Sequence, residues 1–175
     1  MEQIRKYPPV KLIIGFIFKK EDSLKEAKAI LEKQLGKIDF ISPVLTFNHT
    51  DYYEKELGRD LKRSFASFKK LIDPANLAKI KITTNKIEKS LSTGTRRAIN
   101  IDPGYLDLAK LVLASTKDYK HRIYLNKGIF AEVTLFYQDK NFRPWDWTYP
   151  DYRTGEYIAI FNQIREIYAQ QIKAK

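Results

Sequence analysis

A near-continuous apolar run from Val10 to Phe18 (VKLIIGFIF) places the strongest constraint on the fold. A run of this kind, with several β-branched residues and no alternation, is typical of a strand in the middle of a sheet. Because basic residues precede it, the run superficially resembles a signal peptide, but it is far shorter than the roughly 20 residues that span a bilayer. It ends at Lys19-Lys20-Glu21-Asp22, without the small residues of a cleavage site. We therefore expect a buried strand in a cytoplasmic protein with no membrane contact.

A helix and a second strand follow this run. Ser23 and Glu26 fit a capping box at the start of the helix, and Gly36 ends it. The segment KIDFISPVLTF (37–47) predicts a strand that Pro43 bends or leaves at an edge of the sheet.

Two further strands flank a second helix. Residues 61–72 favour a strand, although the spacing of their phenylalanines also permits a helix. Asp73-Pro74 opens a helix in the preferred order, with the cap before the proline. Residues 98–102 give a short strand that Pro103-Gly104 stops. The order strand, helix, strand, strand, helix, strand over about 10–102 predicts an α+β fold with a ferredoxin-like layer of helices on an antiparallel sheet.

The rest of the chain extends this layer with a helix, a hairpin and a last helix. Residues 105–116 (YLDLAKLVLAST) are apolar on almost every side, so a buried helix is narrowly favoured over a strand. From about Thr154 to Gln171 the pattern predicts an amphipathic helix. Its inward side chains are Tyr157, Phe161, Ile164 and Tyr168. No repeat or linker divides the chain, and its 175 residues are most simply one domain, 1–175.

The predicted hairpin consists of two alternating segments, residues 121–125 and 129–137. A three-residue loop at 126–128, with its glycine in the left-handed conformation, fixes the register. This register places Arg122 opposite Glu132, and it leaves His121 on an otherwise apolar face. The remaining pairs are Leu125 with Ile129, Tyr124 with Phe130, Ile123 with Ala131 and His121 with Val133.

Composition excludes several kinds of chemistry. The chain has no cysteine, which rules out disulfides, a thiol nucleophile and cysteine-bound zinc. Its seven glycines are too widely spaced for a P-loop or a dinucleotide-binding fingerprint. Two histidines exclude a histidine-rich metal site but leave open a divalent metal held mainly by carboxylates. The net charge of +11 comes from scattered lysines, so it supports an anionic partner only weakly.

Four polar stretches are candidates for a functional site: 49–56, 96–105, 118–124 and 144–153. Asp102 and His121 are the candidate catalytic residues. His121 would act as an acid or base that Asp102 or Glu132 orients, or these carboxylates would hold the metal. The structural alternatives are a core histidine, an aspartate that bonds its own turn, and an exposed Arg122–Glu132 pair worth under about 1 kcal/mol.

The stretch PWDWTYPDYR (144–153) has two interpretations. An extended segment between its prolines would project its tryptophans to one side, as a clasp that fastens the last helix to the sheet. Alternatively these rings form a stacking surface for a base or sugar, with an arginine nearby for phosphate. The clasp is favoured, with Trp147 as the more buried tryptophan. The candidate ligand-binding residues are Arg122, Glu132, Trp145, Trp147, Asp151 and Arg153.

Several phrases resemble the family catalogued as domain of unknown function 4416, found in bacteria and archaea. They are TDYYEKELG (50–58), RSFASFKKLIDP (63–74), residues 99–125, GIFAEVTLFY (128–137) and WTYPDYR (147–153). The resemblance implies a single-domain cytoplasmic protein and supplies no activity. Some members carry a GTP-binding label, which the glycine spacing does not support.

Three functions remain as hypotheses. The leading one is a pocket that binds, or acts on, a small anionic and phosphorylated ligand. The second is RNA binding through the basic surface, although Phe65 and Phe68 would face opposite sides of a strand and could not stack bases together. The third is a non-enzymatic scaffold whose partner covers an exposed face.

Overall fold

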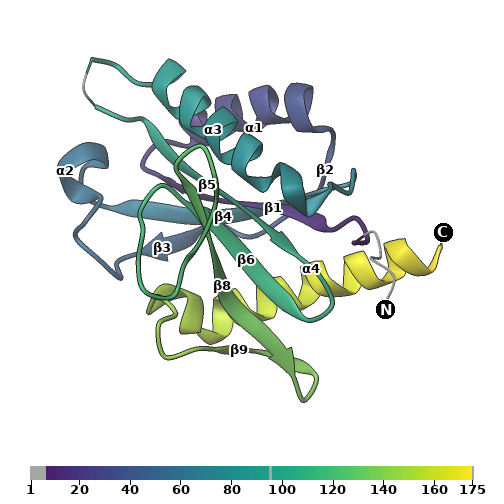
Figure 1. Ribbon diagram of the computed structural model, residues 1–175. Coiled ribbons are helices and arrows are strands. Elements are labelled where there is room, and N and C mark those ends of the chain that lie inside the picture. Colours follow the sequence, from purple (N-terminus) through teal and green to yellow (C-terminus); the bar gives the residue numbers. More distant parts are fainter. Residues whose placement is uncertain (1–6, 95, 175) are drawn as a thin grey trace.

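The computed structural model describes residues 7–94 and 96–174, which form an α+β fold around one antiparallel sheet (Figure 1). The strands are β1 (Lys11–Phe18), β2 (Ile38–Ile41), β3 (Leu45–Phe47), β4 (Leu61–Phe68), β5 (Ile99–Leu106), β6 (Lys110–Ser115), β7 (Ile123–Asn126), β8 (Ile129–Gln138) and β9 (Asn141–Pro144). The helices are α1 (Glu21–Leu35), α2 (Glu54–Leu57), α3 (Leu77–Ser90) and α4 (Gly155–Lys173), with 3-10 turns η1 (Pro74–Asn76) and η2 (Asp151–Arg153).

The nine-stranded sheet has the order β2-β4-β1-β5-β6-β8-β7, with β3 also paired to β4 and β9 to β8. Helices α1 and α3 cover one face of its first half, and α4 crosses the other face (Figure 1). In β1, Leu12, Ile14 and Phe16 pack against α1 and α3. Ile13, between them, belongs to the cluster under α4. Strand β1 therefore has no alternation because both of its faces are buried.

The strands and helices before residue 100 largely agree with the predictions. Asp73 caps η1 by accepting a hydrogen bond from the backbone N–H of Ala75. Helix α1 ends at Gly36 as expected, but the capping box is wrong, because α1 starts at Glu21 and its N-cap Lys20 makes no side-chain cap. Residues 37–47 form two short strands, β2 and β3, which pair with β4 on either side of Pro43.

The predicted helix at 105–116 is wrong. Strand β5 continues through Pro103-Gly104, and β6 pairs with it from Gly104 onward. Leu111 and Leu113 face α4, whereas Val112 and Ala114 pack beside Leu77 of α3. The segment is apolar all round because both faces of β6 are covered, and length and composition could not distinguish this from a buried helix.

The close pairing of β5 with β6 depends on Gly104. A Cβ atom there would collide with the carbonyl oxygen of Val112 and lie 2.8 Å from Leu113 Cδ2. Gly104→Ala should therefore lower the free energy of unfolding by about 1–3 kcal/mol in a urea titration. Gly155→Ala is the matched control, since a Cβ at the start of α4 meets nothing within 4 Å. Equal stability of the two variants would contradict the close packing.

The hairpin has a shorter turn than predicted. The pairs Ile123–Ala131 and Tyr124–Phe130 are present, but Asn126, rather than Leu125, pairs with Ile129. Lys127 and Gly128 have φ values of 51° and 76°, the positive values that a two-residue turn of a twisted hairpin requires. Leu125 therefore lies at a register irregularity, and the predicted pairing of Leu125 with Ile129 is wrong.

The last helix agrees with its prediction. The Thr154 side chain caps α4 by accepting from the backbone N–H of Tyr157. The predicted inward residues Tyr157, Phe161, Ile164 and Tyr168 are all buried. In the described ranges, no helix combines the length and the apolar character that crossing a membrane would require.

Candidate functional site

Glu132 on β8 is the centre of one polar cluster, which we call the Glu132 cluster. Its Oε2 accepts hydrogen bonds from Arg122 Nε at 2.9 Å and is 2.9 Å from His121 Nε2. The three side chains are only 3%, 7% and 12% exposed for Glu132, Arg122 and His121. The pairing of Arg122 with Glu132 is as predicted, but it is a buried ion pair and not an exposed cross-strand pair.

The other nitrogens of Arg122 are also occupied. Nη1 donates to Ser115 Oγ at 3.1 Å and to the Lys117 carbonyl at 2.9 Å, and Nη2 donates to Tyr149 Oη at 2.8 Å. Burial lowers the pKa of Arg122, but its hydrogen bonds to Glu132 and Tyr149 raise it by more. Arg122 thus joins β6, β8 and the segment after β9, which leaves it little capacity to bind a ligand.

The tryptophan segment does not form the predicted clasp. The backbone turns at residues 146–147 instead of remaining extended. Trp147 stacks on both His121 and Trp145, with centroid distances of 5.4 and 5.0 Å. Trp147 is 38% exposed and Trp145 is half-buried, so the expected order of burial is wrong. With two rings already stacked on it, Trp147 is a poor platform for a base.

The segment instead bonds β8 at two residues that lie between the pairing of β8 with β7 and its pairing with β9. Trp147 Nε1 donates to the Val133 carbonyl at 3.1 Å, and Thr148 Oγ1 donates to the Thr134 carbonyl at 2.6 Å. Arg153 Nε donates to the Thr148 carbonyl at 2.8 Å, and its Nη2 bonds the Asp146 carbonyl. Arg153 therefore supports the turn itself, which sequence patterns could not reveal.

A second cluster, the Arg63 site, surrounds a buried guanidinium on β4. Arg63 is 2% exposed, and its Nη2 donates to Asp151 Oδ2 at 3.2 Å. Four aromatic rings surround the guanidinium carbon at centroid distances of 4.9 to 5.6 Å. They belong to Phe47, Phe65, Tyr152 and Tyr157. The ion pair with Asp151 and the packing of Tyr152 and Tyr157 around Arg63 fasten η2 and α4 to the sheet.

Several donors at the Arg63 site have no hydrogen-bond partner in the described part of the chain. They are Arg63 Nε, Arg63 Nη1 and the Tyr157 hydroxyl, all of them buried. Burial lowers the pKa of Arg63, but electrostatic interactions with Tyr152, Tyr157 and Asp151 raise it by more, so the guanidinium stays charged. Burial raises the pKa of Tyr157 to about 12, and the adjacent Arg63 guanidinium lowers it by less, so the hydroxyl keeps its proton near neutral pH. Unsatisfied buried donors are rare in proteins and are costly.

Gly15 on β1 lets two rings of the Arg63 site approach the sheet. It lies between Phe65 and Asp102 in adjacent strands. A Cβ atom on Gly15 would lie 3.1 Å from the Phe65 ring and 3.5 Å from the Tyr152 hydroxyl oxygen. The pairing also places Asp102 on the same face of the sheet as Phe65.

Asp102 belongs to a network of charged side chains in the first half of β5, before the pairing of β5 with β6 begins at Gly104. It accepts from Lys81 Nζ at 3.0 Å and from Asn100 Nδ2 at 2.5 Å, instead of bonding its own turn. Arg97 Nη1 donates to Asn100 and to Glu88, each at 3.0 Å. Burial raises the pKa of Asp102, but Lys81 and Arg63 lower it by more. Asp102 is therefore held as a carboxylate.

The structure brings the predicted residues together only in part. His121, Arg122, Glu132 and Trp147 are in contact, and Glu132, not Asp102, is the carboxylate that orients His121. Asp151 belongs to the Arg63 site. Burial, Asp102 and Tyr149 raise the pKa of Tyr53, whereas Arg63 and Arg97 lower it by less.

Arg63 and Lys81 were missed by sequence reasoning. The detectable sign for Arg63 was its place in a strand, at alternate positions with Leu61 and Phe65, where a charged residue faces the core. Lys81 could not be found in this way, since its partner Asp102 comes from a different element.

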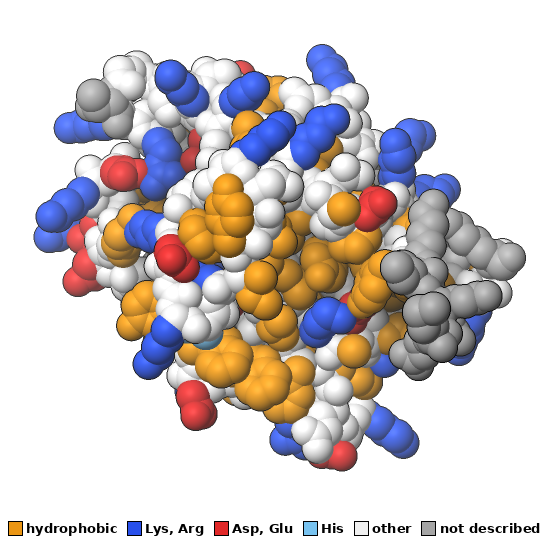
Figure 2. All heavy atoms as spheres, in the orientation of Figure 1, with side chains coloured by type: hydrophobic (Ala, Val, Ile, Leu, Met, Phe, Trp, Pro, Cys, Tyr) orange, Lys and Arg blue, Asp and Glu red, His pale blue; other side chains and the backbone are white. Residues whose placement is uncertain are grey.

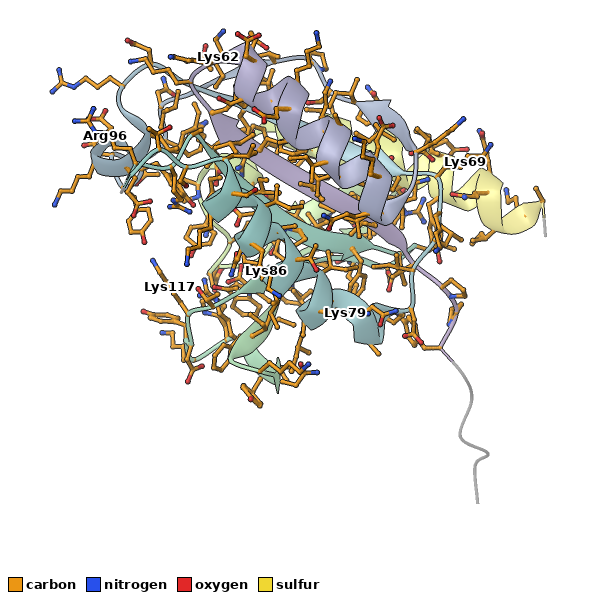
Figure 3. The ribbon with its side chains drawn as sticks, turned by 90° about the horizontal axis from the view of Figure 1, so that it is seen from above. Lys62, Lys69, Lys79, Lys86, Arg96 and Lys117 are labelled. Atoms are coloured by element: carbon orange, nitrogen blue, oxygen red, sulfur yellow. The ribbon has the colours of Figure 1, made fainter. Side chains whose placement is uncertain are left out.

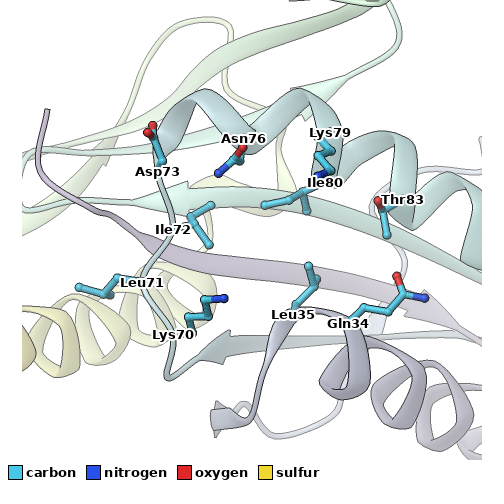
Figure 4. Close-up of a pocket in the computed structure, with 10 residues that line it drawn as sticks. All are labelled: Gln34, Leu35, Lys70, Leu71, Ile72, Asp73, Asn76, Lys79, Ile80 and Thr83. Atoms are coloured by element: carbon cyan, nitrogen blue, oxygen red, sulfur yellow. The ribbon is translucent and has the colours of Figure 1, made fainter. Parts of the chain in front are cut away.

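Two surface hollows lie away from both clusters. One, of about 500 Å³, lies between the end of α1 and the start of α3 (Figure 4). The other, of about 670 Å³, lies near α2 and the start of α1. Within residues 7–94 and 96–174, no three His, Asp or Glu side chains are grouped so as to hold a metal ion.

Comparison with known protein families matches residues 8–168 to one family, which is described as a domain of unknown function (DUF4416). No curated protein and no solved structure matches the chain.

Proposed function

Because the chain belongs to the DUF4416 family, whose description names no activity, we propose its function from its own side chains: it binds a small anionic ligand, of the phosphate-bearing class, at the Arg63 site. The observation that carries this proposal is the buried guanidinium with two nitrogens that lack a partner in the described protein. Arginine is well suited to phosphate, because its donors are charged and point in fixed directions.

The surroundings of Arg63 support an anion over a cation. Among the described residues, Asp151 is the single carboxylate bonded to Arg63, through Nη2, which leaves Nε and Nη1 as donors. The Tyr157 hydroxyl adds a third donor that is protonated near neutral pH. The four aromatic rings lower the local dielectric constant around the guanidinium and thereby strengthen charge-assisted hydrogen bonds. A phosphate or phosphate monoester would accept from all three donors.

Catalysis by His121 with Asp102 remains a prediction, and the geometry gives it less support. His121 is stacked on Trp147 and bonded to Glu132, and Asp102 is bonded to Lys81 and Asn100. A scaffold function also remains a prediction, since no contact among the described residues supports it in particular.

The proposal is tested by two matched tyrosine variants on α4. Tyr157→Phe removes a buried hydroxyl without a partner in the described ranges, whereas Tyr168→Phe removes a hydroxyl that donates to the Pro9 carbonyl at 2.8 Å. Titrations use inorganic phosphate and phenyl phosphate, with chloride at equal ionic strength as the blank. Thermal unfolding should show a stabilisation of roughly 2.7 kcal/mol when the probe is at about 100 times its dissociation constant.

The two variants should behave in opposite ways. Tyr157→Phe should weaken phosphate binding about 10-fold or more, the effect of losing a hydrogen bond to a charged group, and leave stability unchanged. Tyr168→Phe should lose about 1 kcal/mol of stability and bind phosphate normally. If neither probe stabilises the wild type beyond chloride, or if Tyr157→Phe binds as the wild type does, the proposed site is wrong.

A further inference from the structure

Helix α3 exposes a charged surface of one sign. Its exposed side chains are Lys79, Lys86, Lys89 and Ser90. Its single acidic residue, Glu88, is buried and accepts hydrogen bonds from Arg97 and from the backbone N–H of Ile101. In the described chain none of the three lysines forms an ion pair. No carboxylate on α3 therefore offsets their charge.

Helix α1, which packs on the same face of the sheet, is different. Its lysines alternate with the acidic residues Glu21, Asp22, Glu26 and Glu32. Mixed charges of this kind are usual for a solvated helix. The uniform charge of α3 is thus a local feature of one helix and does not simply follow from the net charge of the protein.

A groove next to α3 extends this basic surface. It has a volume of about 500 Å³ and lies between α1 and α3 (Figure 4). Lys70 and Lys79 line it, with Gln34, Asn76 and Thr83 as further hydrogen-bonding groups. Asp73 is the acidic residue among the lining side chains, and it already caps η1. The other lining side chains are apolar, so Lys70 and Lys79 supply the positive charge of the groove.

The views of the molecule agree with this arrangement. In Figure 3, Lys79 and Lys86 follow one another along α3, and Lys117 continues the row in that view. Figure 2 shows Lys and Arg side chains over the upper part of the molecule, where α3 lies, while apolar side chains occupy the centre below it.

We infer that the exposed face of α3 and the adjoining groove bind the phosphodiester backbone of a nucleic acid. Lys79 and Lys89 are ten residues apart, which is about 15 Å along a helix. This length matches roughly four to five nucleotides of one strand at about 3.4 Å each. Lysine contacts to phosphate provide affinity without reading sequence, so the partner class is nucleic acid in general.

The sheet does not take part in this binding. Phe65 and Phe68 are both fully buried, Phe65 in the cluster under α4 and Phe68 in the cluster under α1 and α3. They are not free to stack on bases. An anionic membrane is a weaker match than a nucleic acid, because α3 exposes no large apolar side chain that could enter a lipid interface.

The experiment compares two triple variants with the same change in net charge. One replaces Lys79, Lys86 and Lys89 with glutamine. The control replaces Lys127, Lys140 and Lys173, which are exposed on the β7–β8 turn, the β8–β9 turn and the end of α4. Binding of labelled mixed-sequence RNA and DNA strands of about 20 nucleotides is followed by fluorescence anisotropy between about 50 and 200 mM salt.

The wild type should bind at low salt, and its affinity should fall steeply as salt increases. The α3 variant should bind more weakly, with a slope of log affinity against log salt that is smaller by roughly 2. The control should retain the wild-type slope. Comparison of RNA with DNA then identifies the kind of strand that the surface prefers.

Three results would overturn the inference. The first is that the wild type binds neither strand at about 50 mM salt, where the electrostatic contribution is large. The second is an equal loss of affinity in both triple variants. The third is binding to phosphatidylserine vesicles without binding to either strand. None of these depends on the Arg63 site, since both variants leave it intact.

Discussion

Replacing Glu132 with alanine is expected to lower the free energy of unfolding by about 3–5 kcal/mol, as measured by urea denaturation. Glu132 is 3% exposed and Arg122 is 7% exposed, so the substitution leaves a buried guanidinium without its carboxylate. His121 loses its partner at the same time. An exposed cross-strand pair would instead be worth under about 1 kcal/mol.

The exposed pair Arg143–Asp139 is the internal control for this measurement. Its side chains are 47% and 68% exposed, and Arg143→Ala should change stability by less than about 1 kcal/mol. If Glu132→Ala has an effect as small as Arg143→Ala, solvent screens the Glu132 cluster and our description of it as a buried network is wrong.

Replacing Arg63 with methionine should have a second large effect. It removes the guanidinium from four aromatic rings and leaves Asp151, 7% exposed, without its cation. The expected loss is about 3–5 kcal/mol, with phosphate binding abolished. The double variant Arg63→Met with Asp151→Asn should recover part of the stability and none of the binding.

This pair of variants separates packing from binding at Arg63. Restored stability together with restored phosphate binding would place the anion elsewhere. If the single Arg63→Met variant kept full stability, the Arg63–Asp151 pair would make no net contribution to the free energy of unfolding. Some buried ion pairs behave in this way when apolar residues replace them.

Sequence patterns predicted the parts of the fold that depend on local periodicity. The apolar run of β1, the Asp73-Pro74 start before α3 and the inward face of α4 all follow from side-chain spacing within one element. The ferredoxin-like assignment stays a prediction, although the α+β class is confirmed.

The failures have a common physical cause: they depend on contacts between elements. Strand β6 looks like a helix in sequence because α3 and α4 cover its two faces. Trp147 is exposed because the backbone turns and its indole bonds the edge of β8. Neither neighbour can be identified from the local pattern.

The candidate site shows the same division. The hairpin register correctly joined Arg122 to Glu132, two residues of one supersecondary unit. The Arg63 site combines β4, η2 and α4, and it brings together residues 88 positions apart in the case of Arg63 and Asp151. Such a site becomes visible only when the tertiary structure is known.

The most direct test of the Arg63 proposal is a pair of crystal structures, one grown with phosphate and one with chloride as the only anion. We predict a phosphate whose oxygens accept hydrogen bonds from Arg63 Nε, Arg63 Nη1 and the Tyr157 hydroxyl, the three buried donors without a partner in the described protein. Water molecules on these donors in both crystals would contradict it.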